Sequence, residues 1–326
     1  MNPEKKQKNI LSKKKTAYIL AFISMVIVVI LVSLAITYKN SDQPRSFSKS
    51  IFEAFSLKKE PFLERESFFY PPAAESEKAD SALEEPEVKQ VLDESGSMKK
   101  STSDVWWLNS GGIMLIGEKE FSTNLGSLSR NSNWQKLYAK TNPRDTDEGY
   151  YPQNIFRLVT RFKWKTYAQQ VYFNISKINL SDSEYRNESN GILLFNRYQD
   201  GDNLYYTGLR VDGHAVIKKK IKDKYYTLAE KQIFDNGKKY DIKVNPCLIP
   251  TDSWIGIKSE VENIDSETVR IRLYVDKERN GNWQLVLETS DSGNKFGKKP
   301  FLKKGYAGIR TDFMDVRFEN YSIHKL

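Results

Sequence analysis

Cysteine and histidine are almost absent from this sequence. Its 326 residues include one cysteine, Cys247, and two histidines, His214 and His324. A single cysteine excludes an intramolecular disulfide and leaves no partner for a thiolate metal site. Neither histidine has a cysteine or another histidine close to it in the sequence, so zinc chemistry is not expected. The sequence also lacks the G-x-S-x-G element and the P-loop, which mark α/β-hydrolases and nucleotide-binding enzymes.

A dense basic stripe is also missing. The formal net charge of +9 divides into +5 for residues 1–15 (six Lys, one Glu), −3 for 39–103 (10 basic, 13 acidic) and +7 for 104–326 (35 basic, 28 acidic). Proteins that bind nucleic acids usually concentrate their positive charge more strongly, so no nucleic-acid partner is expected. A mildly basic domain suits an acidic polysaccharide or another envelope polymer better.

One long hydrophobic run is present near the N-terminus. Residues 16–38 contain no charged side chain, and six lysines precede them. At ~1.5 Å per residue, 23 residues span a hydrocarbon core of ~30 Å as a helix. Basic residues before a span stay in the cytoplasm. We therefore expect a cytoplasmic basic tail (1–15), a transmembrane helix (16–38) and an extracytoplasmic C-terminal part, as in single-pass proteins of prokaryotic envelopes.

A cleaved signal peptide is the alternative interpretation of this run. Ser33 and Ala35 are small residues at the −3 and −1 positions of a cleavage site. The hydrophobic region of a signal peptide is usually only about 7–15 residues long, which favours an uncleaved anchor.

Residues 39–103 have the composition of a stalk. Five prolines and an acidic, Ala/Ser-rich run from Glu75 to Glu94 leave little apolar surface to offset the entropy of ordering. We expect a flexible spacer that holds a folded domain away from the membrane. Phe68, Phe69 and Tyr70 are the exception, since these aromatic residues are expected to dock on the folded domain.

From residue 104 to residue 326 the sequence predicts an all-β domain. Aromatic and β-branched residues alternate with polar ones, and turn signals recur every 8–12 residues, which is typical of an antiparallel sandwich or barrel. In 155–164, Phe156, Leu158 and Thr160 fall on one face of a strand and Arg157 and Val159 on the other. No long amphipathic helix and no repeat of solenoid length is found there.

Several motifs in this part resemble the concanavalin A-like lectin/glucanase superfamily. The closing run GYAGIRTDFMDVRFENYSI is similar to the last two strands of that jelly roll, and the hairpins NGILLFNRYQDGDNLYYTGLRVDG and LYVDKERNGNW are similar to its middle strands. The laminin G-like and 3-keto-disaccharide hydrolase-like branches are the nearest. The resemblance implies an antiparallel two-sheet jelly-roll sandwich over 104–326. It specifies function poorly, because one fold hosts many functions.

The acidic residues do not match a glucanase of that superfamily. Such enzymes carry an E-x-D-x-x-E pattern that points two or three carboxylates into a cleft. The nearest cluster is Glu260, Glu262, Asp265 and Glu267, whose spacing does not fit and which is better explained as a solvated turn. A retaining glucanase site is therefore not expected.

Cationic and tyrosine side chains alternate on one side of several predicted strands. This face has three possible roles: a water-facing surface, which is the default for an antiparallel sheet; a surface that binds glycans; or a polysaccharide lyase site, which needs cations against a uronate carboxylate and a Tyr or His to move protons. His214 falls in the turn that leads into one of these strands. The candidate ligand-binding residues are Arg157, Arg161, Tyr206, Arg210, Lys218 and Lys220, with Arg310 and Asp312.

Two further signals concern aromatic residues and metals. Trp106 and Trp107 are adjacent, so one of them faces away from the core of a strand and is a candidate sugar-stacking platform. The run 276–281 resembles the first half of a calcium loop, but Leu287 stands where the bidentate Glu belongs, which excludes an EF-hand. No cofactor and no catalytic metal is expected. A structural calcium ion near Asp312 or Asp315 stays an open alternative.

Together these observations predict a membrane-anchored, extracytoplasmic domain that binds a carbohydrate or envelope glycoconjugate without catalysis. A polysaccharide-degrading enzyme on the same fold, either a glycoside hydrolase or a lyase, is the first alternative. A protein-adhesion module of the laminin G type is the second, and it predicts a large flat apolar patch.

Overall fold

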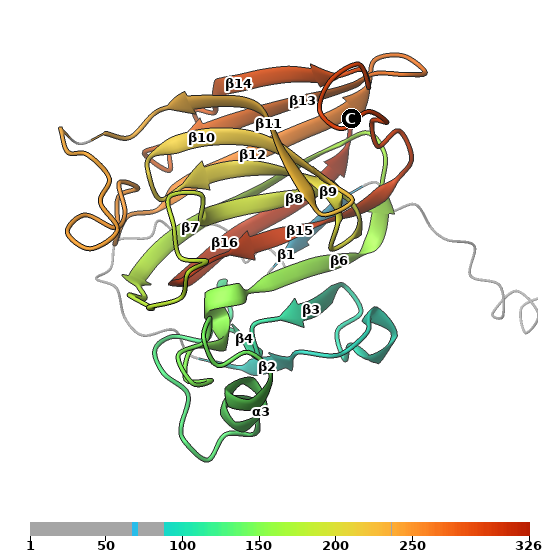
Figure 1. The fold of residues 1–326 in the computed structure, drawn as a ribbon. Coiled ribbons are helices and arrows are strands. Elements are labelled where there is room, and N and C mark those ends of the chain that lie inside the picture. Colours follow the sequence, from blue (N-terminus) through green and yellow to red (C-terminus); the bar gives the residue numbers. More distant parts are fainter. Residues whose placement is uncertain (1–66, 71–87, 236) are drawn as a thin grey trace, which may run out of the picture. The chain divides into compact units, whose positions relative to one another are not determined.

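The computed structural model describes residues 67–70, 88–235 and 237–326, which form two antiparallel β-sheets (Figure 1). All described residues fall in one compact unit of the chain. The expected basic tail and transmembrane helix (16–38) lie outside the described residues. Within the described ranges no helix has the length and apolarity needed to cross a bilayer. The all-β, two-sheet prediction is confirmed.

One sheet has nine strands, and β1 (Ser67–Tyr70) pairs with β16 beside its main order. Along that order the strands are β14 (Gln284–Asp291), β13 (Val269–Asp276), β12 (Ile255–Asn263), β7 (Tyr167–Ile178), β16 (Met314–Lys325), β5 (Glu120–Thr123), β4 (Ile113–Ile116) and β2 (Gln90–Asp93).

The other sheet has seven strands, in the order β11 (Lys224–Gln232), β10 (His214–Ile221), β9 (Asn203–Arg210), β8 (Gly191–Asp200), β15 (Gly305–Thr311), β6 (Arg157–Trp164) and β3 (Trp106–Ser110). Three short helices complete the described part: η1 (Met98–Lys100), α3 (Asn133–Thr141) and η2 (Pro152–Ile155). Strands β8 to β11 are sequential hairpins, whereas β15 enters between β6 and β8 from far along the chain.

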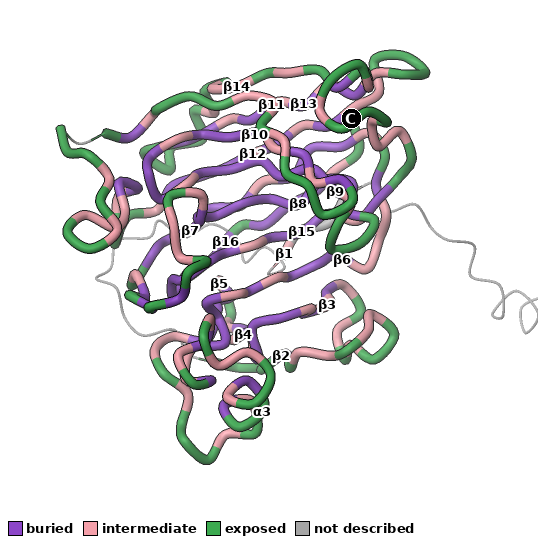
Figure 2. The backbone as a smooth tube through the Cα atoms, viewed as in Figure 1, coloured by how far each residue is buried: buried purple, intermediate pink, exposed green. Residues whose placement is uncertain are grey.

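The main core consists of inward-facing residues from both sheets, and buried residues follow the strands of each (Figure 2). The alternation of side chains along each strand determines which residues enter the core. Leu158, Ile309 and Leu194 face inward from the neighbouring strands β6, β15 and β8, and all three are fully buried. At the β3 side, the Trp106 ring packs edge-on against Tyr321, with centroids 4.8 Å apart.

The folded unit begins earlier than the expected boundary at residue 104. β1 and β2 both lie in the segment 39–103 that composition assigns to a flexible stalk, and both pair within the nine-stranded sheet. Leu92 of β2 is completely buried in the main core, and the ring of Tyr70 in β1 packs edge-on against Trp106 and Phe121 at 5.7 and 5.5 Å. The expected docking of the segment around Tyr70 is confirmed. A few apolar residues suffice to order these strands because the sheet already offers an edge.

Candidate functional site

Strand register brings most of the predicted site residues onto one side of the seven-stranded sheet. Arg310 of β15 lies opposite Arg157 of β6, and Lys218 of β10 lies opposite Tyr206 of β9. Residues directly opposite each other in an antiparallel pair point to the same side. The reverse side of these strands belongs to the main core, so this side, here called the outer face, is turned away from the core. Lys220 of β10 belongs to it as well.

The outer face has an apolar floor rather than a wholly polar surface. A second hydrophobic cluster covers it, separate from the main core, and Met98, Trp107 and Tyr306 pack at its border. Trp107 therefore faces outward while Trp106 is buried in the main core, as expected for an adjacent pair in a strand. The floor consists of Val159, Leu193, Phe195, Tyr198, Leu204, Tyr206 and Val216.

Two tyrosines and an arginine meet at the centre of the outer face. The ring of Tyr206 is 3% exposed and stacks on that of Tyr225, which is 51% exposed, with centroids 6.1 Å apart. The Arg310 guanidinium lies 5.5 Å from the Tyr206 ring centre, and its Nη1 is 3.4 Å from the Tyr206 hydroxyl. The group thus joins a flat aromatic surface to a fixed cation.

The two tyrosine hydroxyls differ in acidity. Burial raises the pKa of Tyr206. Burial also acts to raise the pKa of Tyr225, but the charges of Arg310 and Lys220 outweigh it and leave that pKa below its ordinary value. The more exposed tyrosine is therefore the one whose anion is stabilised.

Several predicted cations are already neutralised by carboxylates of the same domain. The Arg310 Nε donates to both oxygens of Asp312, at 2.9 and 3.0 Å. Arg161 turns aside and donates to the carbonyl of Ser103, at the edge of the sheet. The remaining pairs are Arg210 with Asp212 (2.5 Å) and Glu230 (3.1 Å), and Lys220 with Asp202 (3.0 Å) and Asp223 (2.8 Å).

Arg157 and Lys218 differ from these paired cations. Neither has a carboxylate within 4.0 Å in the described part of the chain. Arg157 Nη1 donates to the Ser110 hydroxyl at 3.3 Å. Desolvation lowers the pKa of Lys218, and the nearby charges of Arg210 and Arg310 add to that effect. Among the predicted site residues, these two cations remain available for an external anion.

Beside Arg157 lies a carboxyl group that composition assigned to the stalk. One oxygen of Glu94, Oε2, accepts the Gly112 N–H at 2.9 Å and the Tyr138 hydroxyl at 2.5 Å. Burial raises the pKa of Glu94, while Tyr138, Gly112 and the charge of Arg157 act in the opposite direction. Sequence reasoning missed Glu94 because an acidic run gives no sign of docking, and missed Tyr225 although its strand follows Lys220 through a tight turn.

The expected calcium alternative near Asp312 or Asp315 does not fit the donors found there. The Asp315 carboxylate accepts N–H groups from Gly126 (2.7 Å), Gln153 (2.9 Å) and Asn179 (2.9 Å). The Asp312 carboxylate faces the Arg310 guanidinium. Calcium requires several oxygen ligands, whereas these carboxylates are surrounded by hydrogen-bond donors. Within the described ranges no three His, Cys, Asp or Glu residues gather as metal ligands.

Comparison with known proteins identifies no family. No family model matches the sequence, and no curated protein matches it. Among solved structures, the carbohydrate-binding module CBM66 from Bacillus subtilis is similar at 14% identity over 52% of this chain and 82% of that one, with a TM-score of 0.35. The exoplasmic/lumenal domain of VIP36, in its Ca2+/Man-bound form, is similar at 10% identity over 74% and 92%, with a TM-score of 0.38.

A third similar structure is the GH43 protein BlXynB from Bacillus licheniformis. The identity is 12%, the TM-score is 0.34, and the similarity covers 64% of this chain but only 33% of that one. Similarity at the level of these three structures establishes neither a family nor a function.

Proposed function

We propose that the outer face of the seven-stranded sheet binds a carbohydrate that carries acidic groups, and that it does so without catalysis. The observation that carries this proposal is the combination of the stacked Tyr206–Tyr225 pair with Arg157 and Lys218, two predicted cations that have no carboxylate within 4.0 Å among the described residues. The half-exposed Tyr225 ring offers a flat surface for a sugar ring. A carboxylate or sulfate on the sugar supplies the charge that Arg157 and Lys218 lack.

The apolar floor strengthens such an interaction. Val159, Leu193 and Val216 exclude water from one side of the cationic groups, and charge pairing is stronger where the local dielectric is lower. Arginine pairs with carboxylates in a two-pronged geometry, and lysine pairs as a point charge. A neutral sugar cannot form these charge pairs, so the outer face should bind acidic glycans more tightly than neutral ones.

The sequence supplies the setting for this site. We propose that residues 16–38 anchor the protein in a membrane, with residues 1–15 in the cytoplasm and the sandwich outside, where polysaccharides and envelope glycoconjugates are found. We also assign the sandwich to the concanavalin A-like jelly rolls. The motif resemblance supports this assignment, because its closing run supplies β15 and β16, one strand for each sheet.

Binding of the full chain in detergent micelles to an array of neutral, uronate-containing and sulfated polysaccharides tests the proposed function. Selective, salt-sensitive binding to acidic glycans is expected, and its loss by at least tenfold in the Arg157→Gln/Lys218→Gln variant. The Lys136→Gln/Arg144→Gln variant removes the same charge from exposed positions and should bind like the wild type. Equal binding by all three proteins would refute the assignment of the site.

One observation favours a second candidate, cleavage of a uronate-containing glycan by β-elimination. The lowered pKa of Tyr225 suits a base. Its phenolate would take the C5 proton, the C5–H electrons would form the C4–C5 double bond, and the departing oxygen at C4 would take a proton from the Lys218 ammonium. Arg310 would stabilise the charge that develops on the uronate carboxylate. An unsaturated, ultraviolet-absorbing product that disappears in Tyr225→Phe would establish this candidate, and bound but uncleaved glycan would exclude it.

A further inference from the structure

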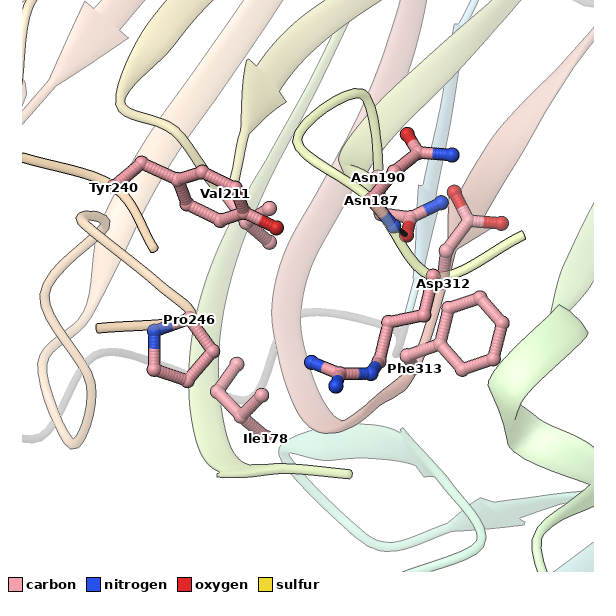
Figure 3. A pocket seen from close by; sticks show the side chains of 9 residues that line it. Ile178, Asn187, Asn190, Val211, Tyr240, Pro246, Asp312 and Phe313 are labelled. Atoms are coloured by element: carbon pink, nitrogen blue, oxygen red, sulfur yellow. Dashed lines mark hydrogen bonds between the residues drawn. The ribbon is translucent and has the colours of Figure 1, made fainter. Parts of the chain in front are cut away.

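A shallow pocket opens at one end of the sandwich, beside the outer face (Figure 3). Its lining includes Asn190, immediately before β8; Val211, immediately after β9; and Asp312, immediately after β15. Much of its space is open to solvent and the enclosed part is small, so it suits one charged substituent of a ligand and not a whole sugar ring.

A fixed cation lines this pocket. Arg186 donates from Nε to the Ser181 carbonyl at 2.6 Å and from Nη1 to the Ile242 carbonyl at 2.9 Å. These bonds hold the guanidinium plane in place but leave Nη2 without a partner in the described residues. Carbonyl oxygens do not neutralise the charge, and Arg186 forms no ion pair with any described carboxylate. A positioned guanidinium with a free N–H edge is a ready partner for a carboxylate.

Other polar groups of the lining are also hydrogen-bond donors. The side-chain oxygen of Asn190 accepts the Asn187 N–H at 2.6 Å, which leaves its amide nitrogen to donate. Tyr240 contributes a hydroxyl and a ring face (Figure 3). An amide, a phenol and a guanidinium around one small space form a donor set for an anionic oxygen.

Three carboxylates near this pocket have other partners. Asp312, the acidic residue of the lining, is held by Arg310 of the outer face. Asp212 is held by Arg210. Asp241 accepts the backbone N–H groups of Lys243 and Val244, each at 2.8 Å. Glu188, which acts on the Tyr240 hydroxyl through its charge, is exposed on the preceding loop. The charge of Arg186 therefore stays uncompensated within the lining.

We propose that this pocket receives the carboxylate of a terminal acidic sugar, with Arg186 as its charge partner and Asn190 and Tyr240 as hydrogen-bond donors. The inference rests on the proposed function and extends it, because the Arg310–Asp312 pair connects the pocket to the outer face. A glycan that lies on that face ends at the pocket. The pocket then binds the acidic sugar at the end of the chain, and the outer face binds the sugars before it.

Titration of the full chain in micelles with D-glucuronate, followed by ligand-observed NMR, tests this assignment. Wild-type protein is expected to bind glucuronate at least tenfold more tightly than its methyl ester, which keeps the ring and loses the charge. Arg186→Gln should weaken glucuronate binding at least tenfold. The matched control, Arg144→Gln, removes an arginine that is 81% exposed on the surface and should change nothing.

Arg186 also supports two carbonyls, so a second variant separates binding from folding. Tyr240→Phe keeps the packed ring, removes one donor and should weaken glucuronate binding several-fold with an unchanged unfolding temperature. Absence of glucuronate binding in the wild type, or wild-type binding in both variants, would overturn the pocket assignment. If a polymeric acidic glycan still bound and Arg157→Gln/Lys218→Gln abolished that binding, the proposed function would stand while the pocket assignment fell. Glucuronate binding lost in Arg186→Gln, without any polymer binding, would support the pocket and refute the proposed role of the outer face.

Discussion

The buried ion pair between Lys219 and Asp291 gives a sharp prediction about stability. Both side chains are fully buried, with 2.7 Å between Lys219 Nζ and Asp291 Oδ2. Nζ also donates to the Lys298 carbonyl at 3.0 Å, and the Tyr205 hydroxyl donates to the same Asp291 oxygen at 2.6 Å. The pair joins β10 to the end of β14 and to the loop after it. Lys219→Met keeps most of the apolar stem and removes the charge.

The substitution leaves Asp291 buried with its Tyr205 partner but without a cation. Breaking a buried pair from one side costs about 3–5 kcal/mol. For a unit the size of residues 64–326, about 2–4 °C is lost per kcal/mol, so the midpoint of thermal unfolding should fall by roughly 6–20 °C. Circular dichroism of the full chain at neutral pH measures it, with Lys224→Met at an exposed position as the control.

The double variant Lys219→Met/Asp291→Leu separates charge from packing. Replacing both partners by apolar residues is often neutral or stabilising, so the double variant should recover most of the lost midpoint. A single variant within 1–2 °C of the wild type would refute the reasoning, since about 6 °C is the smallest fall expected. A double variant as unstable as the single one would show that the cost comes from packing.

Three other predictions concern the face, the orientation and the boundary. Desolvation lowers the pKa of Lys218, so this side chain loses its charge at a lower pH than an ordinary lysine does. The affinity for an acidic glycan should therefore decline as the pH rises. In a binding titration, Lys218→Arg should abolish the early part of that decline, because arginine keeps its charge. Protease added outside intact cells should digest the sandwich, and full protection would contradict the orientation inferred from the N-terminal lysines. Tyr70→Ala should lower the unfolding free energy by about 2 kcal/mol, because the ring packing is lost. The control Tyr185→Ala, at a residue that is 64% exposed, should leave the unfolding free energy unchanged. If Tyr70→Ala were as stable as the wild type, β1 would lie outside the folded unit.

Local alternation was enough to predict many strands and their faces. The run 155–164 is predicted as one strand and folds as β6, and on β9 the residues that alternate with the predicted site residue Tyr206, namely Tyr205 and Thr207, are fully buried on the core side of the sheet. The two-residue period of a strand determines which side chains share a face, whatever the partner strand. The turns between β8, β9 and β10 are short enough to determine their pairing as well.

Pairing between distant strands was harder to predict. Arg310 lies beside Arg157 only because β15 inserts between β6 and β8, and no local pattern encodes that neighbour. The run Lys218–Lys219–Lys220 shows a second limit. The two-residue alternation of the strand turns Lys219 toward the core. A lysine can be buried there only because its charge is paired with Asp291, which is more than 70 residues away in the sequence. Glu94 shows a third, because an acidic flank gave no sign that it docks on a preformed sheet.

The short strand β1 also has a mechanical consequence. Its first residue, Ser67, lies beside His324, and Tyr70 lies beside Tyr321, so the chain enters the domain at the end where β16 finishes. The pocket lies at the opposite end, where β15 turns into β16. Under the proposed anchoring, tension between a captured glycan and the membrane therefore pulls β1 along its own axis. Hydrogen bonds between antiparallel strands run across that axis, so the β1–β16 ladder is loaded in shear and must yield all at once instead of opening rung by rung.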